Sequence, residues 1–250
     1  MHELLDAGFI VYGMSCKAAA GENRNGIVFL LFDVTNDESV AAVVREVLER
    51  SGRIDVLVNN AGVGIAGAAE ESSIEQARAL FETNVFGSIR MTRAVLPHMR
   101  EQGGGRIINV SSVLGLVPAP FMALYAATKH AIEGYSESLD HEVREHGVRV
   151  LLVEPGYTNT AFDANAVAVD EPLALYARRR EAFDVLTAAA VRAGDEPSVV
   201  SQVIVAAATD TRPRLRYPAG TLARRVSKLR RYVPPAIFDK QIRKTSQLAA

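Results

Sequence analysis

The sequence predicts an α/β protein in which a doubly wound parallel sheet lies between two layers of helices. Apolar runs of strand length recur along the chain, and uninterrupted runs are typical of parallel strands that are covered on both faces. Segments with apolar residues at helical spacing separate these runs, which is the alternation expected of right-handed crossovers. The chain has 250 residues, a length that suits one large unit of this kind.

Each element expected in the first part of the chain has a local signal. A helical turn at 2–7 ends at Gly8, because glycine accepts the left-handed conformation that closes a helix. Apolar residues recur at helical spacing over 37–50, with Asn36 or Thr35 as the N-cap. Apolar runs predict strands at 9–14, 27–32 and 54–58, and the run at 27–32 is uninterrupted.

The second part of the chain continues the alternation. Helical spacing covers 73–99 and is interrupted at Asn84 and Gly87. An interrupted helical pattern within 157–195 is expected to form a lid over a crevice. The remaining predicted elements are strands at 107–110, 149–153 and 214–217, and helices at 121–146 and 197–208.

Charge is distributed unevenly, although the net charge is only -1. From Arg212 onward the chain has eleven Lys or Arg against one acidic residue, Asp239. We therefore divide the chain into a domain at 1–217, which includes the lid at 157–195, and a basic helical extension at 218–250. Such an extension suits self-packing, an acidic partner or peripheral contact with an anionic membrane. No nucleic-acid-binding motif accompanies it, so no nucleic acid partner is expected.

Composition disfavours several classes of protein. The single cysteine, Cys16, excludes an intrachain disulfide, and no Cys/His cluster has the spacing of metal ligands. The first residues lack a basic flank before an apolar run, and no apolar run approaches membrane-spanning length. We expect a cytoplasmic protein without a metal.

Three residues that suit proton transfer lie close together in the chain. Ser112 follows the strand at 107–110, and Tyr125 and Lys129 are one turn apart on the next helix, hence on one face. The reference pKa of tyrosine is about 10, so a nearby cation is needed to favour its phenolate at neutral pH. Lys129 supplies that cation. Ser112 can donate a hydrogen bond to a substrate oxygen that becomes negative.

Asn84 is a fourth candidate, because at a helix interruption it can hold a water that links Lys129 to solvent. Each candidate also has a structural interpretation: a helix-surface aromatic for Tyr125, a solvated charge for Lys129, a turn residue for Ser112 and a helix-breaking cap for Asn84. Their order, between NNAG at 59–62 and the Pro-Gly pair after a later strand, favours the catalytic interpretation.

Polar residues also follow the other predicted strands. In an open parallel sheet, ligands bind outside the carboxyl ends of the strands, where the strand order reverses. The residues that stand after such a strand are Asp33 with Val34, Asn59, Asn60, Ser112 and the PGYTNT segment at 155–160, which contains Thr158. We expect one crevice to collect them.

Together these motifs resemble those of the short-chain dehydrogenase/reductase family, over about residues 3–217. The similarity rests on DVT at Asp33, NNAG at Asn59, TN at Thr83, NVSS at Asn109, YAATK at Tyr125 and PGYTNT at Pro155. It implies a three-layer Rossmann-like fold and NAD(P)-dependent interconversion of a carbonyl and a secondary alcohol.

The resemblance also implies a role for each candidate. Tyr125 would be the general acid/base, Lys129 its activator and a ligand of the nicotinamide ribose, Ser112 the catalytic serine thirteen residues before the tyrosine, and Asn84 the fourth catalytic member. Asp33 with Val34 would meet the adenine, Asn60 the cofactor ribose region and Thr158 the carboxamide end.

The sequence departs from the family at its beginning. The family starts with a strand and a TGxxxGxG turn that holds the pyrophosphate, and neither precedes the strand at 9–14. That first strand would be central, so its lack is expected to leave an open slot in the sheet between 9–14 and 54–58. Two explanations compete. Either the start is misassigned or the chain shortened, or this is a truncated form. The alternative to an enzyme is a catalytically silent binding or scaffold protein with impaired cofactor binding.

The sequence also supports more specific expectations about the cofactor and the substrate. NADP is expected over NAD, because no acid stands near the end of the strand at 9–14 and Lys17 is available for a 2′-phosphate. The alternative interpretation of Lys17 is an exposed loop charge. Apolar residues around the expected crevice suit a small lipophilic carbonyl or alcohol substrate, namely Leu114, Leu116, Val117, Phe121, Met122, Phe162, Leu173 and Tyr176. In similar family members the long helix carrying Tyr125 joins a homo-dimer or homo-tetramer interface.

Overall fold

The computed structural model describes residues 1–16, 21–162 and 165–246, without the side chains of Arg231 and Pro235. Its strands are β1 (Tyr12–Ser15), β2 (Asn23–Arg24), β3 (Ile27–Leu31), β4 (Val56–Asn59), β5 (Ile65–Ala66), β6 (Gly105–Val110), β7 (Val148–Pro155), β8 (Val167–Ala168) and β9 (Arg216–Ala219). Its helices are α1 (His2–Asp6), α2 (Asp37–Ser51), α3 (Ile74–Phe81), α4 (Gly87–Glu101), α5 (Ala123–Val143), α6 (Ala177–Arg192), α7 (Pro197–Thr209), α8 (Gly220–Tyr232) and α9 (Pro235–Thr245). A π-helix (Glu82–Phe86) joins α3 to α4, and short 3-10 turns follow several elements, at Ala69–Glu71, Val113–Gly115, Arg144–His146 and Ala174–Tyr176.

The main sheet is in two parts. One part has the order β4-β6-β7-β9 with all neighbours parallel, and the other has the order β1-β3-β2 with β2 antiparallel. Among the described strands none joins β1 to β4, so the two parts are not hydrogen-bonded to each other. Ile10, which was expected within the first strand, lies just before β1 and is 74% exposed.

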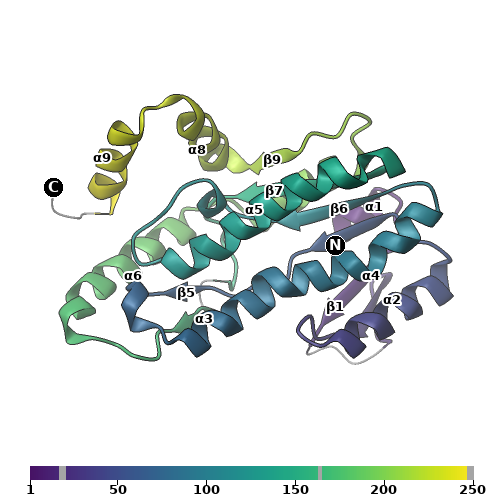
Figure 1. The fold of residues 1–250 in the computed structure, drawn as a ribbon, viewed down its shortest axis with the longest axis horizontal. Helices are drawn as coiled ribbons and strands as arrows, with labels where there is room; N and C mark the ends of the chain where they lie inside the picture. Colours follow the sequence, from purple (N-terminus) through teal and green to yellow (C-terminus); the bar gives the residue numbers. More distant parts are fainter. Residues whose placement is uncertain (17–20, 163–164, 247–250) are drawn as a thin grey trace.

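Helices cover both faces of the larger part of the sheet (Figure 1). On one face Ile107 and Val150 share a core with α2, α4 and α5. On the other face Ile108 and Leu151 share a core with α7, and α1 packs beside it. Successive residues of one strand thus enter opposite cores, which is why these strands are apolar without interruption. The predicted doubly wound architecture is confirmed.

The layer formed by α2 and α4 bridges the two parts of the sheet. Leu30 of β3 lies in the same core as residues of β4 and β6. Val34 packs against the first residue of α4, since a Cβ added to Gly87 would come within 2.6 Å of Val34 Cγ2. Arg90 of α4 also pairs with Asp37 at the start of α2, at 2.6 Å. The bridge therefore relies on close packing at one glycine.

Element boundaries differ from the expected ones where backbone geometry intervenes. The long helix begins two residues after Phe121, which has a φ of 63° and cannot be helical. It closes at Gly147 through a 3-10 turn, as predicted. Asn36 is the N-cap of α2, because its Oδ1 accepts a hydrogen bond from Ser39 N at 2.8 Å. The last strand, β9, starts two residues later than expected.

The C-terminal helices α8 and α9 extend beyond β9, and α9 stands apart from the sheet in Figure 1. No helix in the described part of the chain is long and apolar enough to cross a membrane. Within residues 1–16, 21–162 and 165–246, no three His, Cys, Asp or Glu side chains gather as metal ligands would.

The contact between Gly87 and Val34 leads to a stability prediction. Gly87→Ala should lower the free energy of unfolding by about 1–3 kcal/mol, because the added methyl overpacks the site. Helix propensity alone would favour alanine by about 1 kcal/mol. The sign of the change in the free energy of unfolding therefore distinguishes overpacking from helix propensity, and urea denaturation followed by circular dichroism measures it. Gly134→Ala on α5 is the control, since a Cβ there meets no atom within 4 Å. A stabilised Gly87→Ala variant would contradict the predicted overpacking.

Candidate active site

Lys129 of α5 is a buried cation at the end of β6. It is 7% exposed, and its ammonium donates a hydrogen bond to Val110 O at 2.9 Å. Burial lowers the pKa of Lys129 to about 8, although the negative charge of Glu133 acts to raise it. At neutral pH the side chain is therefore still mainly protonated. Its Nζ lies 5.5 Å from the centre of the Tyr125 ring.

Tyr125 lies one turn before Lys129 on the same face of α5, as the spacing predicts. It is 7% exposed, and the ring of Phe162 packs against it with the ring centres 5.8 Å apart. Phe162 belongs to the segment expected to form the lid, and it also contacts the loop after β4, because a Cβ on Gly64 would lie 3.3 Å from its ring. A residue of the lid segment thus covers the tyrosine.

Asn84 lies in the π-helix between α3 and α4 and is 2% exposed. Insertions of this kind are frequent at functional sites. Its Oδ1 accepts a hydrogen bond from Val63 N at 2.8 Å, and its Nδ2 donates to Val63 O at 2.9 Å and to Thr128 Oγ1 at 3.2 Å. The amide therefore holds the loop after β4 against α5. Gly62 lies in this loop, and a Cβ on it would be 3.4 Å from Asn84 Oδ1 and 4.0 Å from Lys129 Nζ.

The two serines after β6 have different surroundings. Ser112 is half-buried, and its Oγ accepts a hydrogen bond from Leu114 N at 3.1 Å. A hydroxyl that accepts in this way still has its own hydrogen to donate. Ser111 is only 3% exposed and lies beside Glu133. Ser112 is therefore the partly accessible serine of the two.

The predicted cofactor residues stand at the carboxyl ends of their strands. Asn60 is exposed after β4, and Val34 packs on Gly87 after β3. Asp33 Oδ1 accepts hydrogen bonds from Thr35 Oγ1 at 2.7 Å and Thr35 N at 2.9 Å, which lower the pKa of this carboxyl. Thr158 follows β7 and forms a parallel bridge with Asp195. Lys17 lies outside the described residues.

A buried amide network, which the sequence reasoning missed, fixes the ends of β4 and β6. Asn59 Nδ2 donates to Asn109 Oδ1 at 2.8 Å and to Thr92 Oγ1 of α4 at 3.3 Å. Asn109 Nδ2 donates to Ser136 Oγ of α5 at 2.7 Å. Two strands and two helices are thus joined at the edge where the candidate residues lie. The repeated asparagines at strand ends were the available signal.

A single buried carboxylate, also missed, anchors the lid segment. Glu71 has no exposed surface and forms an ion pair with Arg180 of α6. Its Oε1 accepts a hydrogen bond from Leu173 N at 2.8 Å, and its Oε2 accepts one from Ala68 N at 2.9 Å. Burial acts to raise the pKa of Glu71, but these donors together hold it below its usual value. Nothing in its local sequence distinguishes Glu71 from its neighbour Glu70.

Strand and aromatic contacts complete this anchorage. β5, after β4, pairs in parallel with β8 of the lid segment. Phe121 packs its ring against Tyr176, with centres 6.4 Å apart, and against Phe183 of α6, with centres 5.7 Å apart. Phe121 and Tyr176 belong to the apolar wall expected from the sequence. The lid segment therefore lies against the loops that carry the candidate residues.

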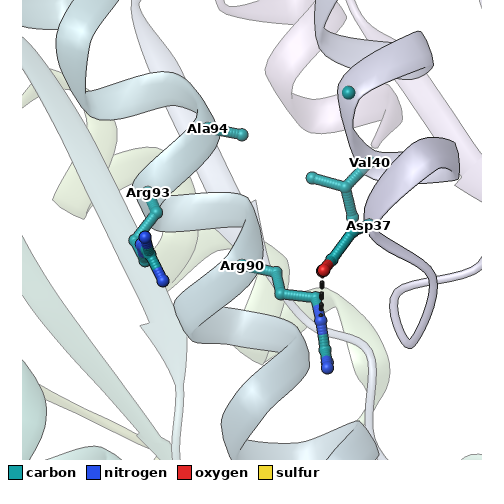
Figure 2. A pocket seen from close by; sticks show the side chains of 6 residues that line it. Asp37, Val40, Arg90, Arg93 and Ala94 are labelled. Atoms are coloured by element: carbon teal, nitrogen blue, oxygen red, sulfur yellow. Dashed lines mark hydrogen bonds and ion pairs between the residues drawn. The ribbon is translucent and has the colours of Figure 1, made fainter.

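A shallow hollow of about 300 Å³ lies elsewhere, between α2 and α4. Figure 2 shows Arg90 turned toward Asp37 across it, with Arg93 on the other side of the helix. A second hollow of about 380 Å³ continues along the same groove past Leu48 and His98. Neither hollow contains any of the predicted catalytic residues, and their role at the strand ends stays a prediction.

Comparisons with known proteins agree with the fold described above. The sequence profile of the short chain dehydrogenase family matches residues 12–170. A 3-ketodihydrosphingosine reductase of Bacteroides thetaiotaomicron is 45% identical over 162 residues, which are 65% of this chain. The match spans 60% of that reductase, so this chain aligns with less than two thirds of its length.

Solved structures show the same fold. A short-chain dehydrogenase from Streptomyces avermitilis superposes with a TM-score of 0.81 and 32% identity, covering 98% of this chain and 92% of that one. A short-chain dehydrogenase from Burkholderia cenocepacia in complex with NADP gives a TM-score of 0.75 at 26% identity, covering 96% and 89%. The three-layer Rossmann-like architecture is thereby confirmed.

The anchoring role of Glu71 is testable by hydrogen exchange. Glu71→Gln removes the charge that pairs with Arg180, so the amide of Leu173 should exchange about tenfold faster or more, as loss of a charge-assisted hydrogen bond implies. Mass spectrometry of peptides covering 168–185 measures this change. Glu70→Gln is the matched control, because Glu70 is an exposed neighbour that accepts a hydrogen bond from the Tyr176 hydroxyl and does not pair with Arg180. Equal exchange in both variants would contradict the role assigned to Glu71.

Proposed function

The chain belongs to the short-chain dehydrogenase family of oxidoreductases, and from that premise we propose that it interconverts a carbonyl and a secondary alcohol, with Tyr125 transferring the hydroxyl proton. One observation carries this proposal: the buried ammonium of Lys129 faces the Tyr125 ring while Val110 O fixes its position. A cation at this place favours the phenolate over the phenol. Tyr125 then serves as an acid or a base near neutral pH.

The other catalytic residues have supporting geometry. Ser112, with its hydroxyl hydrogen available, donates to the substrate oxygen as negative charge develops there. Asn84 fixes the loop after β4 against α5 through Val63 and Thr128. In this proposal Asn84 keeps Lys129 and Tyr125 correctly positioned relative to the substrate. It also holds the water that exchanges protons with Lys129.

A nicotinamide cofactor, when bound, supplies or accepts the hydride. The described residues fit its two ends. Gly62 lies close to Lys129, since a Cβ on it would stand 4.0 Å from Lys129 Nζ, and Asn60 is exposed in the same loop. We assign both to the nicotinamide ribose region with Tyr125 and Lys129. Asp33 and Val34 are assigned to the adenine end, and Thr158 to the carboxamide.

The phosphate-binding part of the site differs from the family pattern. The described residues include no TGxxxGxG turn beside the slot between β1 and β4. The affinity of this 250-residue chain for its cofactor is therefore the quantity to measure. We propose NADP before NAD, with Lys17 toward the 2′-phosphate. Solved relatives hold either cofactor, NADP in the Burkholderia cenocepacia structure and NAD in one from Burkholderia phymatum, so the choice rests on Lys17.

The proposed substrate is lipophilic. Aromatic rings line this region, because Phe162 packs on Tyr125 and Phe121 packs on Tyr176 of the lid segment. Apolar walls favour apolar substrates. The name of the Bacteroides thetaiotaomicron relative gives a ketone of the sphingoid class as its substrate, which is consistent with such walls. A small lipophilic ketone or alcohol is the class to assay first.

Replacing the proposed acid/base tests the reaction. Tyr125→Phe should lower the oxidation of NADPH with a lipophilic ketone by about 10²–10⁴-fold, the usual contribution of general acid-base catalysis. NADPH binding, followed by fluorescence, should change far less, because the phenyl ring remains. Tyr232→Phe is the control and should retain activity, because Tyr232 is 76% exposed on α8. Unaltered turnover in Tyr125→Phe would refute the proposal, and a failure of the wild type to bind NADPH would favour a silent binding or scaffold protein.

We further propose peripheral contact of α8 and α9 with an anionic membrane. Apolar side chains are exposed on these helices, at 42% for Leu222, 49% for Leu229, 76% for Tyr232 and 60% for Ile237. Basic side chains, including Arg224, Arg225 and Lys228, are exposed on α8 beside them. Helices that combine both kinds of residue bind membrane surfaces.

Co-sedimentation with phosphatidylserine vesicles tests this contact. Arg224→Ser with Lys228→Ser should weaken binding roughly tenfold or more, because each basic residue near an anionic surface contributes about 1 kcal/mol. The charge-matched control is Arg78→Ser with Arg100→Ser, two exposed arginines on other helices. Equal binding to uncharged phosphatidylcholine vesicles, or no loss in the α8 variant, would contradict the proposal.

A further inference from the structure

A second group of charged side chains is buried one helical turn beyond Lys129. Glu133 of α5 is 5% exposed, and Glu154 of β7 has no exposed surface. Arg216 of β9 lies between them, with Nε 3.1 Å from Glu133 Oε2 and 3.3 Å from Glu154 Oε1. Its Nη2 is engaged by the exposed Glu137 at 3.0 Å. Two buried carboxylates therefore share one guanidinium, which balances only one of their charges.

Hydrogen bonds within the described part of the chain do not make up the difference. Neither oxygen of Glu154 has a hydrogen-bond partner. Glu133 is better placed, because the Ser111 hydroxyl beside it acts to lower the pKa of this carboxyl. The space around them is filled, since a Cβ on Gly115 would come within 2.6 Å of Ser111 Oγ and 3.2 Å of Glu133 Oε1. An ionised carboxylate is costly in such a place, and taking up a proton removes the cost.

The titration behaviour of the two carboxyls agrees with their surroundings. Burial, and then the negative charge of Glu133, raises the pKa of Glu154 to about 8. Burial also raises the pKa of Glu133. At neutral pH the two groups therefore retain a proton between them, and they titrate as a coupled pair rather than as separate residues.

The charge of this pair reaches the proposed proton-transfer site. Glu133 is four residues after Lys129 on α5, and its negative charge raises the pKa of Lys129 against the effect of burial. His130 of α5 and Arg216 of β9 also act on Glu133, each lowering its pKa, and Glu137 of α5 faces the pair through its ion pair with Arg216. A change in the charge of the pair is therefore felt at Lys129.

We propose that Glu133 and Glu154 share one proton and act as positioning residues, whose single negative charge keeps Lys129 cationic beside Tyr125. The consequence of this shared proton for turnover rests on the proposed function, whereas the shared proton itself is a property of the folded chain alone. As pH rises and the shared proton leaves to solvent, the pair gains a second negative charge and holds Lys129 protonated more strongly. The pair thus resists the loss of the cation at alkaline pH.

Infrared spectroscopy of the full chain tests the shared proton. At pH 7 the difference spectrum between wild type and Glu154→Gln should show the C=O stretch of a protonated carboxylic acid, and this band should fade as pH rises through about 8. Glu137→Gln is the matched control, because it removes an exposed carboxylate from the same arginine and should reveal no such band. A wild type without a protonated carboxyl at pH 7 would overturn the proposal.

The effect on Lys129 is measured by NMR of protein labelled with ¹⁵N-lysine, with Lys129→Arg identifying the signal. Glu133→Gln should lower the titration midpoint of Lys129 by about one pH unit, as loss of an adjacent opposite charge implies, and Glu137→Gln should not. Glu154→Gln is the second variant. It fixes the pair at one negative charge, so Lys129 should titrate in one narrow step, whereas the wild-type curve is broadened. An unchanged midpoint in folded Glu133→Gln, or identical curves in Glu154→Gln and wild type, would overturn the positioning role.

Both spectroscopic measurements are made without substrate or cofactor, so they decide the inference even if the chain shows no turnover. Where turnover is found, Glu133→Gln should shift the pH midpoint of kcat/KM downward together with the midpoint of Lys129. Glu137→Gln should leave the profile in place. A kcat/KM profile that stays fixed while Lys129 shifts would refute the link to catalysis and leave the proton-sharing pair intact.

Discussion

The burial of the Lys129 ammonium against the end of β6 is the constraint on which the candidate active site depends. A buried lysine needs an acceptor and a nearby negative charge, and the fold provides Val110 O and Glu133. Both come from elements that pack against each other, β6 and α5 itself. Since Tyr125 lies on the same face of α5, placing the cation also places the tyrosine. The geometry of the proton-transfer pair thus follows from helix-on-sheet packing.

Positioning of the strand ends is the second requirement, and polar groups meet it inside the molecule. Asn59 and Asn109 join β4 and β6 to both covering helices through buried hydrogen bonds. Buried amides of this kind are favourable only when their partners are in place. The network is therefore satisfied in one arrangement of β4, β6, α4 and α5, which is the arrangement that brings the loop at Gly62 beside Lys129.

The two parts of the sheet depend on helices for their connection. Without a strand between β1 and β4 among the described residues, ladder hydrogen bonds do not join them. Apolar packing under α2 and α4 and the ion pair of Arg90 with Asp37 join them instead. Asp33 and Val34, which we propose for the adenine end of the cofactor, belong to the smaller part, whereas Tyr125 and Lys129 belong to the larger. Cofactor binding across this boundary therefore depends on the same helix contacts.

The sequence by itself determined the alternation of strands and helices and the pairing of Tyr125 with Lys129. These features are periodic or local, and apolar runs and i,i+4 spacing report them directly. Tertiary structure alone decided the partners that come from distant segments. Glu71 meets Arg180, Asn59 meets Asn109, and Glu133 meets Glu154 and Arg216 only after the chain has folded. Burial then sets the charge of each group, because the cost of an ion depends on the donors and charges around it rather than on its sequence neighbours.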